Sequence, residues 1–388
     1  MKVLVLTPFY KFFVKGLTDS IAKHEKIEEI NVLVHHNYLS ELAPLVPISY
    51  SKFVEKFRKN NLVSKSEYPE KVKVHVVSTL YFIPDGRNRG LGDKLFKIFD
   101  SYITKKPLEF DIIHAHFTWP QGYVAIKLGE KNRVPVVIHV HENQEWFMRL
   151  LLSKNKKIHS TWRRATALIR VNKKSIPLLK EFNVNTFYLP NGFNTTLQVS
   201  KNFARNKLKL SSDTKILFGL GHLIGRKGFQ YLVESMNKII RKRKDVICYI
   251  GGEGPLKKKL EDQIKKLNLQ EHVKLLGFIP DEELYLWMNA ADIFVLPSLS
   301  ESFGVVQIEA MACGTPVVAT INGGSEEIII SEDYGLLCKP GDAKDLAEKI
   351  LIALEKEWDR EKIRKYAEQF TWDNIAKQVV RVYEEVLK

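Results

Sequence analysis

The sequence predicts an α/β protein made of two doubly wound units, and three observations support this prediction. The chain has 388 residues, which is more than one ordinary hydrophobic core holds. Short unbroken apolar runs, typical of buried parallel strands, alternate with stretches of helical spacing. Two glycine-bearing segments, 221–228 and 251–255, follow such runs and precede helical stretches. Open α/β sheets bind their ligands at such positions.

Each half of the chain has its own set of predicted strands. In the first half these are residues 2–7, 31–35, 72–77, 111–114, 134–140, 167–171 and 186–189. In the second half they are residues 215–219, 246–250, 272–275, 292–296 and 316–319. Helical patterns lie between most of them, which predicts parallel strands joined by crossover helices.

The boundary between the two units is predicted near residue 195. The chain there reads LPNGFNTTLQVSKNFARNKLKLSSD, which is rich in turn formers and has little periodicity. We therefore expect a first domain over 1–195 and a second that begins at 196.

The composition excludes several classes of protein. With 45% hydrophobic and 27% charged residues, the chain has globular composition. The three cysteines, Cys248, Cys313 and Cys338, are too few and too scattered for a disulfide framework or a four-ligand zinc site. So few cysteines fit a reducing compartment best. No run approaches the roughly 20 apolar residues of a membrane span, and the first residues read as a strand, so a cytoplasmic location is expected.

The positive charge is concentrated in the first half of the chain. Residues 1–190 contain 31 Lys and Arg against 17 Asp and Glu, whereas residues 191–388 contain 29 against 28. Such a field attracts anionic lipid, phosphorylated acceptors or nucleic acid, and solvated Lys-rich faces give the same count. A basic nucleic-acid-binding protein remains an alternative, but no nucleic-acid partner is expected, because no known binding signature accompanies the charge.

The segment SLSESFGVVQIEAMACGTPVVAT contains the first candidate site. A turn over 298–302 follows a strand and leads into a helix near Phe303, and the free N–H groups of a helix start suit a phosphate or sugar oxygens. Glu301 stands in the turn, and Glu309 lies two helical turns further on among apolar residues. A poorly hydrated carboxylate would be satisfied by a diol that donates two hydrogen bonds. The alternative is that both carboxylates cap local backbone.

The second candidate site is GLGHLIGRKGFQYLVES, after the strand at 215–219. Glycines free the backbone there, and Arg226 and Lys227 place two cations at the start of a helix, which indicates a diphosphate site. The spacing departs from the dinucleotide fingerprint, and the nearest acidic residue, Glu253, lies too far along the chain. Close packing around the glycines is the alternative.

Two histidine pairs follow strands in the first half, His114 with His116 and His139 with His141. A histidine just beyond the end of a parallel strand reaches the ligand-binding crevice, so His116 and His141 are candidates for contact with substrate. For His114 and His139 an ordinary core position is favoured. A zinc site is an open alternative, although the pattern lacks a clear further ligand.

These motifs, in their order along the chain, resemble glycosyltransferase family 4. The resemblance rests on a Gly-bearing first loop, a His after a mid-chain strand, G-x-L-x-x-x-K-G, Glu-x7-Glu within ESFGVVQIEAMACGTPVVA, and a following GG-x-x-E. It implies a GT-B fold, in which two Rossmann-like doubly wound domains face each other across a cleft. The first domain, 1–195, would be completed by a C-terminal helix over about 372–388, and the donor domain would span 196–371.

The resemblance also implies roles for residues. Glu301 would contact the donor sugar, Glu309 the ribose hydroxyls and Lys227 the donor diphosphate, with His141 as the catalytic-site His. The substrate-binding set would further include Gly16, His116, His222, Arg226, Phe303, Gly304 and Val305. His222 stands where the family commonly has Arg, so Arg226 is the candidate to replace that cation, and Gly16 stands where the family commonly has paired glycines.

The implied reaction is a retaining transfer of a hexose-type sugar from a nucleoside diphosphate sugar to a lipid-linked or polysaccharide acceptor. We expect no cofactor, and no metal either, since the chain contains no Asp-x-Asp pair. We expect a peripheral position on the inner, anionic face of the cell membrane. A GT-B phosphorylase, a nucleotide-sugar epimerase and a dinucleotide enzyme are the competing enzymes. A paired-carboxylate glycosidase mechanism is disfavoured, because both glutamates lie beside the phosphate-type helix start.

Overall fold

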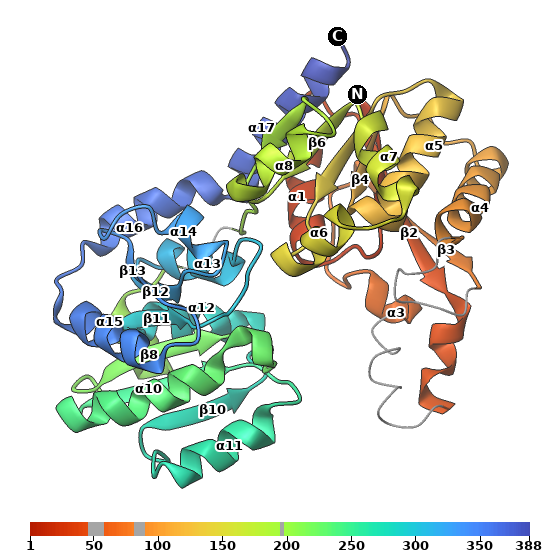
Figure 1. Ribbon diagram of the computed structural model, residues 1–388. Helices are drawn as coiled ribbons and strands as arrows, with labels where there is room; N and C mark the ends of the chain where they lie inside the picture. The colour runs from red at the N-terminus through yellow and green to blue at the C-terminus, as the bar shows by residue number, and fades with distance from the viewer. Residues whose placement is uncertain (46–57, 81–89, 195–197) are drawn as a thin grey trace. The chain divides into compact units, whose positions relative to one another are not determined.

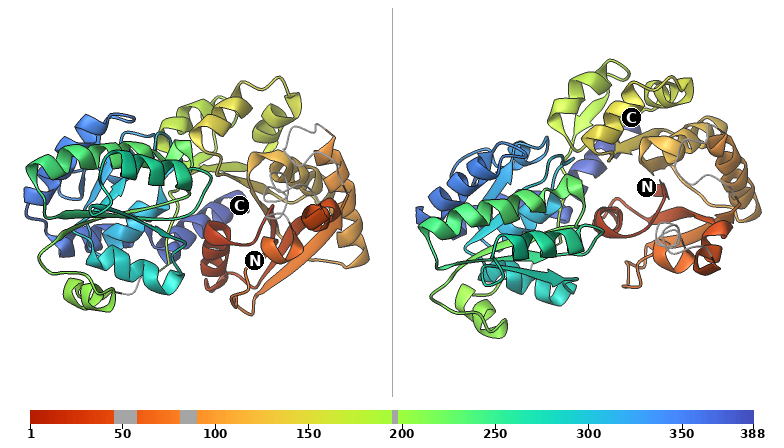
Figure 2. Two further views of the ribbon diagram at one scale, coloured as in Figure 1. Left: turned by 90° about the horizontal axis from the view of Figure 1, so that it is seen from below. Right: turned by 60° about the horizontal axis from the view of Figure 1, so that its bottom comes forward.

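The computed structural model describes residues 1–45, 58–80, 90–194 and 198–388. The chain forms two compact units, an N-terminal unit of Met1–Gly192 with Trp372–Lys388 and a C-terminal unit of Phe193–Thr371. Each is a parallel sheet with helices on both faces (Figures 1 and 2). The predicted junction at residue 195 lies outside the described residues.

The N-terminal unit has a seven-stranded sheet in the order β3-β2-β1-β4-β5-β6-β7, counted over the described residues. Every neighbouring pair is parallel, and the order reverses between β1 and β4, as in doubly wound folds. All seven predicted strands are present, with ends shifted by a few residues. They are β1 (Lys2–Thr7), β2 (Glu29–Asn37), β3 (Val72–Thr79), β4 (Ile112–His116), β5 (Val136–Val140), β6 (Ala167–Arg170) and β7 (Thr186–Tyr188).

Two helices far apart in the sequence cover one face of this sheet, α1 (Phe12–Ala22) and α17 (Trp372–Val386). The prediction that Gly16 lies in a loop is wrong, because it lies inside α1. A Cβ at Gly16 would lie 2.3 Å from Nε1 of Trp372, so glycine is needed here for helix packing. The contact explains how the C-terminal helix completes the first sheet unit.

The other face carries the remaining long helices of the unit. Leu95 and Phe99 of α4, Val124 of α5 and Trp162 of α7 pack there on strand residues such as Ile138. The elements not yet given are η1 (Tyr38–Leu45), α3 (Lys59–Leu62), α4 (Leu91–Lys105), η2 (Thr118–Gly122), α5 (Tyr123–Asn132), α6 (Gln144–Leu151), α7 (Lys156–Arg164), η3 (Lys173–Ser175) and α8 (Ile176–Lys180).

The C-terminal unit has a six-stranded parallel sheet in the order β10-β9-β8-β11-β12-β13, again over the described residues. The five predicted strands are present. A sixth, β13, was missed because its sequence, GLLC, offers only a short apolar run without β-branched residues. The strands are β8 (Lys215–Leu220), β9 (Val246–Gly251), β10 (Val273–Gly277), β11 (Ile293–Leu296), β12 (Val317–Thr320) and β13 (Gly335–Cys338).

Helices also cover both faces of the second sheet. α10, α11 and α15 share one core with the strands, and α12, α13 and α16 share the other. No helix within the described ranges is long and apolar enough to cross a bilayer. The elements are α9 (Lys201–Lys207), η4 (Gly225–Lys227), α10 (Phe229–Lys242), α11 (Lys257–Lys266), α12 (Asp281–Ala290), α13 (Val305–Ala312), α14 (Ser325–Ile328), α15 (Ala343–Glu355), α16 (Arg360–Ala367) and η5 (Glu368–Phe370).

Candidate functional site

In the C-terminal unit, the loops that follow β8 and β11 meet at the carboxyl ends of the strands. These two strands are neighbours at the point where the strand order reverses, which is the usual ligand position in such sheets. The amide of Leu299 in the second loop donates to the carbonyl of Arg226 in the first, at 2.7 Å. The fold therefore joins the two motifs that the sequence analysis singled out.

Glu301 is the anionic centre of this site. Its Oε1 accepts hydrogen bonds from Nζ of Lys227 at 2.6 Å and from Oγ of Ser298 at 2.7 Å. Its Oε2 lies 3.3 Å from Nη1 of Arg226. Burial alone would raise the pKa of the Glu301 carboxyl, but the charges of Lys227 and Arg226 and the hydrogen bonds hold it below its ordinary value. The carboxylate is thus ionised and fixes two cations side by side.

The backbone of the first loop requires a glycine at position 228. Gly228 has φ +71°, and a Cβ there would lie 1.9 Å from the carbonyl oxygen of Pro297. Only glycine lets the turn after Lys227 pass so close to the loop after β11. At Gly225, three residues earlier, a Cβ would have no atom within 4 Å, so an added methyl group meets open space.

These two glycines give a matched pair of variants. Gly228→Ala should lower the free energy of unfolding by about 2–5 kcal/mol, since a left-handed conformation and a steric overlap both have to be accommodated. Gly225→Ala should change it by less than about 0.5 kcal/mol, as is usual for surface substitutions. Urea titration measures both values, and equal stability of the two variants would show that the loops do not meet as described.

The start of α13 adds backbone N–H groups to the site. Gly304 has φ +90° and leads into the helix, whose first residue is Val305. The ring of Phe303 is buried and packs edge-on against Phe370 at 5.8 Å between centroids. The side chain of Phe303 therefore belongs to the core of the unit and is not available to a ligand.

A third loop, after β12, supports the turn that holds Glu301. The backbone N–H of Glu301 donates to the carbonyl of Asn322 at 3.0 Å. The side-chain oxygen of Asn322 accepts from the amides of Gly324 and Ser325, which closes the loop on itself. A Cβ at Gly324 would lie 2.7 Å from Cα of Phe303, so the GG-x-x-E motif acts here through close backbone packing.

Glu309 differs from Glu301 in its surroundings. It lies on α13, half-buried, and no residue of the described part of the chain forms a hydrogen bond with its carboxylate. Desolvation, with the charge of Asp281 as a second cause, raises the pKa of Glu309 to about 7. A carboxylate with open acceptor positions and a raised pKa fits a group that accepts hydrogen bonds from a bound ligand.

His222 lies in the loop after β8 and is exposed. Its backbone carbonyl accepts from the amide of Ile224, but among the described residues its ring forms no hydrogen bond, so no polar contact fixes the ring. Arg226, in contrast, is held by Glu301 and by the carbonyl of Ser300. Of the two candidates for the second cation, Arg226 is the one that the loop positions.

In the N-terminal unit, His116 and His141 form a buried pair. Nδ1 of His116 lies 2.9 Å from Nε2 of His141, and the two rings are nearly parallel. His141 is 7% exposed and packs against the rings of Phe13 and Phe117. His116 is 0% exposed, so the structure does not show the predicted contact with substrate, which stays a prediction.

Arg170 of β6 holds the segment that carries His141. Its guanidinium donates to the carbonyls of Val140 at 2.9 Å and Glu142 at 2.6 Å, on either side of His141. It also lies over the ring of Phe147 at 4.6 Å. A buried arginine thus fixes the backbone at position 141 from the neighbouring strand.

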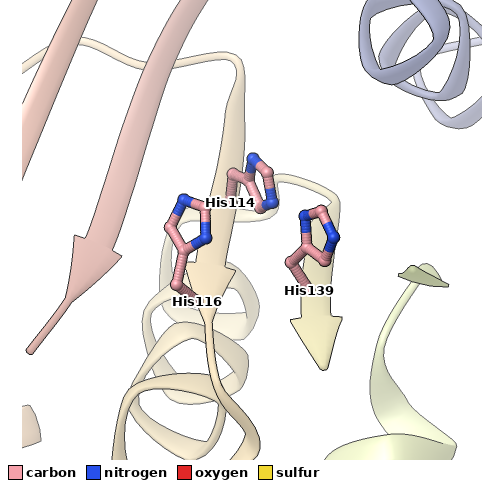
Figure 3. A group of neighbouring side chains, drawn as sticks. All are labelled: His114, His116 and His139. Atoms are coloured by element: carbon pink, nitrogen blue, oxygen red, sulfur yellow. The ribbon is translucent and has the colours of Figure 1, made fainter. Parts of the chain in front are cut away.

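Three histidines of the N-terminal unit lie close together with ligand nitrogens facing one another. His114 and His116 project from β4, and His139 projects from β5 beside them (Figure 3). One ligand nitrogen from each ring lies within 4.8 Å of the others. Zinc bound at 2.0–2.1 Å from each nitrogen needs separations of about 3.4 Å, and the nearby Arg170 charge opposes a buried dication. The Arg170 charge therefore disfavours a divalent metal ion at these rings.

Sequence reasoning missed the residues that support the site. Ser298 donates to Glu301, Asn322 anchors the turn, and Arg170 fixes the His141 segment. Ser298 and Asn322 stand within the motifs and were passed over because polar residues are ordinary in turns. Arg170, a charge inside the strand run at 167–171, was the one visible signal, since a charge buried there needs partners.

Comparisons with known proteins agree with this geometry. Residues 200–370 match the family model of the glycosyl transferases group 1, and residues 62–197 match that of Glycosyltransferase Family 4. An uncharacterized glycosyltransferase of Methanocaldococcus jannaschii is 32% identical over 300 residues, which cover 71% of this chain and 75% of the relative. Mannosylfructose-phosphate synthase of Agrobacterium fabrum is 25% identical over 324 residues, covering 73% and 70%.

Solved structures share the fold. Sucrose-phosphate synthase from Thermosynechococcus elongatus aligns with a TM-score of 0.76 at 22% identity, over 100% of this chain and 99% of that one. HepE of Anabaena, solved with UDP and glucose, aligns with a TM-score of 0.67 at 22% identity, over 99% and 100%.

Two Rossmann-like units, the second with a glycine-rich cationic loop at its strand ends, define a protein of the GT-B fold class. The sequence matches then give the family. The chain belongs to glycosyltransferase family 4, among the group 1 glycosyltransferases.

Proposed function

We propose that the protein transfers a hexose-type sugar from a nucleoside diphosphate sugar to an acceptor hydroxyl, with retention at the anomeric carbon. The ion network of Lys227, Glu301 and Arg226 beside the start of α13 is the observation that carries the proposal. Two fixed cations and free helix amides match a diphosphate in charge and in hydrogen-bonding character.

Each group of the site takes one part of the donor. Lys227 and Arg226, with the amides at Gly304 and Val305, bind the diphosphate. Glu301 holds the cations and contacts the sugar, and Glu309 accepts the two ribose hydroxyls. As the glycosidic bond stretches, negative charge grows on the leaving diphosphate, so preorganised cations stabilise the transition state more than the ground state.

The raised pKa of Glu309 gives a pH dependence. Its pKa of about 7 means that the carboxylate ionises as the pH rises through neutrality, and the ionised form accepts hydrogen bonds from a diol more strongly. Affinity for the nucleoside diphosphate should therefore rise by about tenfold between pH 6 and pH 8. Calorimetric titrations of wild type and Glu309→Gln at both pH values check this. The phosphate of the nucleotide titrates in both experiments, so the tenfold difference should be present only in wild type.

In this proposal His141 positions or polarises the reacting groups, and the leaving phosphate takes the proton of the acceptor hydroxyl. Nε2 of His141 is paired with His116 and Nδ1 is buried, so substrate reaches Nδ1 only if the side chains around it rearrange. The reaction then needs no general base of its own on the protein.

The diphosphate is proposed to be bound without a metal ion or other cofactor. The sequence contains no Asp-x-Asp pair, and the cation pair offers the charge that a divalent ion would otherwise supply. Turnover should persist after exhaustive chelation with EDTA.

A thermal-shift panel of UDP, GDP, ADP and their sugars tests the proposal, followed by product analysis with a labelled donor. One nucleoside diphosphate should raise the melting temperature, since ligands that bind only the folded state stabilise it. A labelled glycoside with retained configuration supports the proposal. A free sugar phosphate would indicate a phosphorylase, an epimerised donor an epimerase, and a shift by NAD alone a dinucleotide enzyme.

The acceptor is proposed to be lipid-linked or a growing polysaccharide, reached at the inner face of the cell membrane. This rests on the charge asymmetry, with nearly all of the net +15 in the first half of the chain. Flotation with vesicles should show binding that grows with the anionic lipid fraction and falls with salt. Binding to duplex DNA but not to vesicles would favour the nucleic-acid alternative instead.

A further inference from the structure

The hydrogen bond between His116 and His141 constrains how His141 can act. Its Nε2 is engaged by Nδ1 of His116 at 2.9 Å. Nδ1 of His141 and Nε2 of His116 are buried and have no hydrogen-bond partner among the described residues. The pair therefore forms a closed two-ring unit with one unpartnered nitrogen at each end.

Both rings are neutral at physiological pH. Burial is the main cause that holds the pKa of each well below its ordinary value, and the neighbouring histidines lower it further. A neutral imidazole has one N–H donor and one acceptor nitrogen. If His116 donates, His141 carries its proton on Nδ1, and if His141 donates, its Nδ1 is a bare acceptor. The direction of this one hydrogen bond thus decides whether Nδ1 of His141 is a donor or an acceptor toward a substrate.

We infer that His116 is a positioning residue that holds His141 in one tautomer and one ring orientation for sugar transfer. The inference rests on the proposed function of His141. It gives His116 a role that its complete burial in this structure allows. His116 is suited to the task because it stands at the last position of β4, where it is paired with His139 of β5.

The other groups around His141 do not supply this constraint. The ring of His139 lies 3.9 Å away, centroid to centroid, and is nearly parallel, but it contacts His141 by stacking. Phe13 and Phe117 have no polar atoms to donate or accept. Among the described residues, His116 forms the hydrogen bond that distinguishes the two nitrogens of His141.

The direct test is nitrogen-15 NMR of the imidazoles in the full-length protein, since the two nitrogens of a neutral ring differ in shift according to which is protonated. Wild type should show His141 as a single neutral tautomer, and His116→Phe should show a mixture. A mixture of tautomers in wild type overturns the inference, whatever the donor sugar is.

Kinetics supply the second readout, with nucleotide release measured on whichever of UDP-glucose, GDP-mannose and ADP-glucose turns over. His116→Phe should lower kcat by about 10- to 100-fold with little change in donor KM, because orienting partners act through the group they hold. His116→Asn keeps a polar atom near the position of Nδ1 of His116, so it can still pair with Nε2 of His141 and should recover most of kcat. His139→Asn is the control that removes a stacked ring without touching the hydrogen bond.

The double variant separates this inference from the proposed function. Because His116 acts through His141, His116→Phe in a His141→Asn background should cost less than about twofold more. If the losses multiply in full, or if His116→Phe turns over like wild type, the positioning role is wrong. If His141→Asn itself turns over normally, the failure lies with the proposed role of His141. Should His116→Phe not fold, the Asn variant and the wild-type spectrum still decide.

Discussion

Lys227→Ala should lower kcat by about 10²- to 10³-fold, the loss expected when one preorganised group that stabilises developing charge is removed. Lys227 donates to Glu301 at 2.6 Å and lies at the turn before α10. Affinity for the free nucleoside diphosphate should fall as well, because the anion then faces Arg226 alone.

The melting temperature should fall much less than the activity does. Glu301 keeps hydrogen bonds from Ser298 and an ion pair with Arg226 in the variant. Lys258→Ala is the matched control, since it removes the same charge from an exposed position on α11 of the same unit. Equal turnover of Lys227→Ala and wild type would remove the proposed mechanism.

Glu301→Gln should lower kcat by a similar factor of about 10² but with the opposite effect on binding of the product nucleotide. The amide is nearly the same shape, but it no longer neutralises the two cations. UDP, or whichever nucleoside diphosphate binds, should then bind as tightly as in wild type or more tightly, because two uncompensated cations face it. Turnover falls because Lys227 loses the carboxylate that positions it and the sugar loses its contact.

A double-mutant cycle makes the coupling measurable. Lys227 and Glu301 contact each other directly, so the double variant should lose less activity than the product of the two single losses. Fully multiplicative losses would show that the two residues act on separate steps. Calorimetry with the same nucleotide on all four proteins provides the binding side of the cycle.

Most of the fold could be predicted from the sequence. Apolar runs such as 2–7 and 292–296 have a length, and a proline directly after them, that fit buried parallel strands. The strand β13 was missed because Gly335–Cys338 is too short an apolar run to indicate a strand by itself, and its pairing with β12 is not visible in the local sequence. Gly16 was assigned to a loop by the resemblance to a family with glycines in its first loop, whereas here it makes room for Trp372, more than 350 residues away.

The candidate site was predicted in its residue types but not in its internal contacts. The motifs placed Lys227 and Glu301 in ligand-binding loops, and the structure adds that the two form an ion pair. His116 was assigned to substrate because it follows a strand, yet the ring turns inward to His141. Side-chain direction at a strand end depends on the tertiary packing around it, and one sequence without that packing leaves both directions open.

The central claim is that fixed protein cations, in place of a bound ion, neutralise the departing diphosphate. Isothermal titration of the nucleoside diphosphate selected by the thermal-shift panel tests it most directly, with wild type and Lys227→Ala, each in EDTA and in magnesium. The account predicts the same wild-type affinity in both buffers and about a 10²-fold weaker affinity for the variant in both. Wild-type binding that requires magnesium, with Lys227→Ala unaffected, would contradict it.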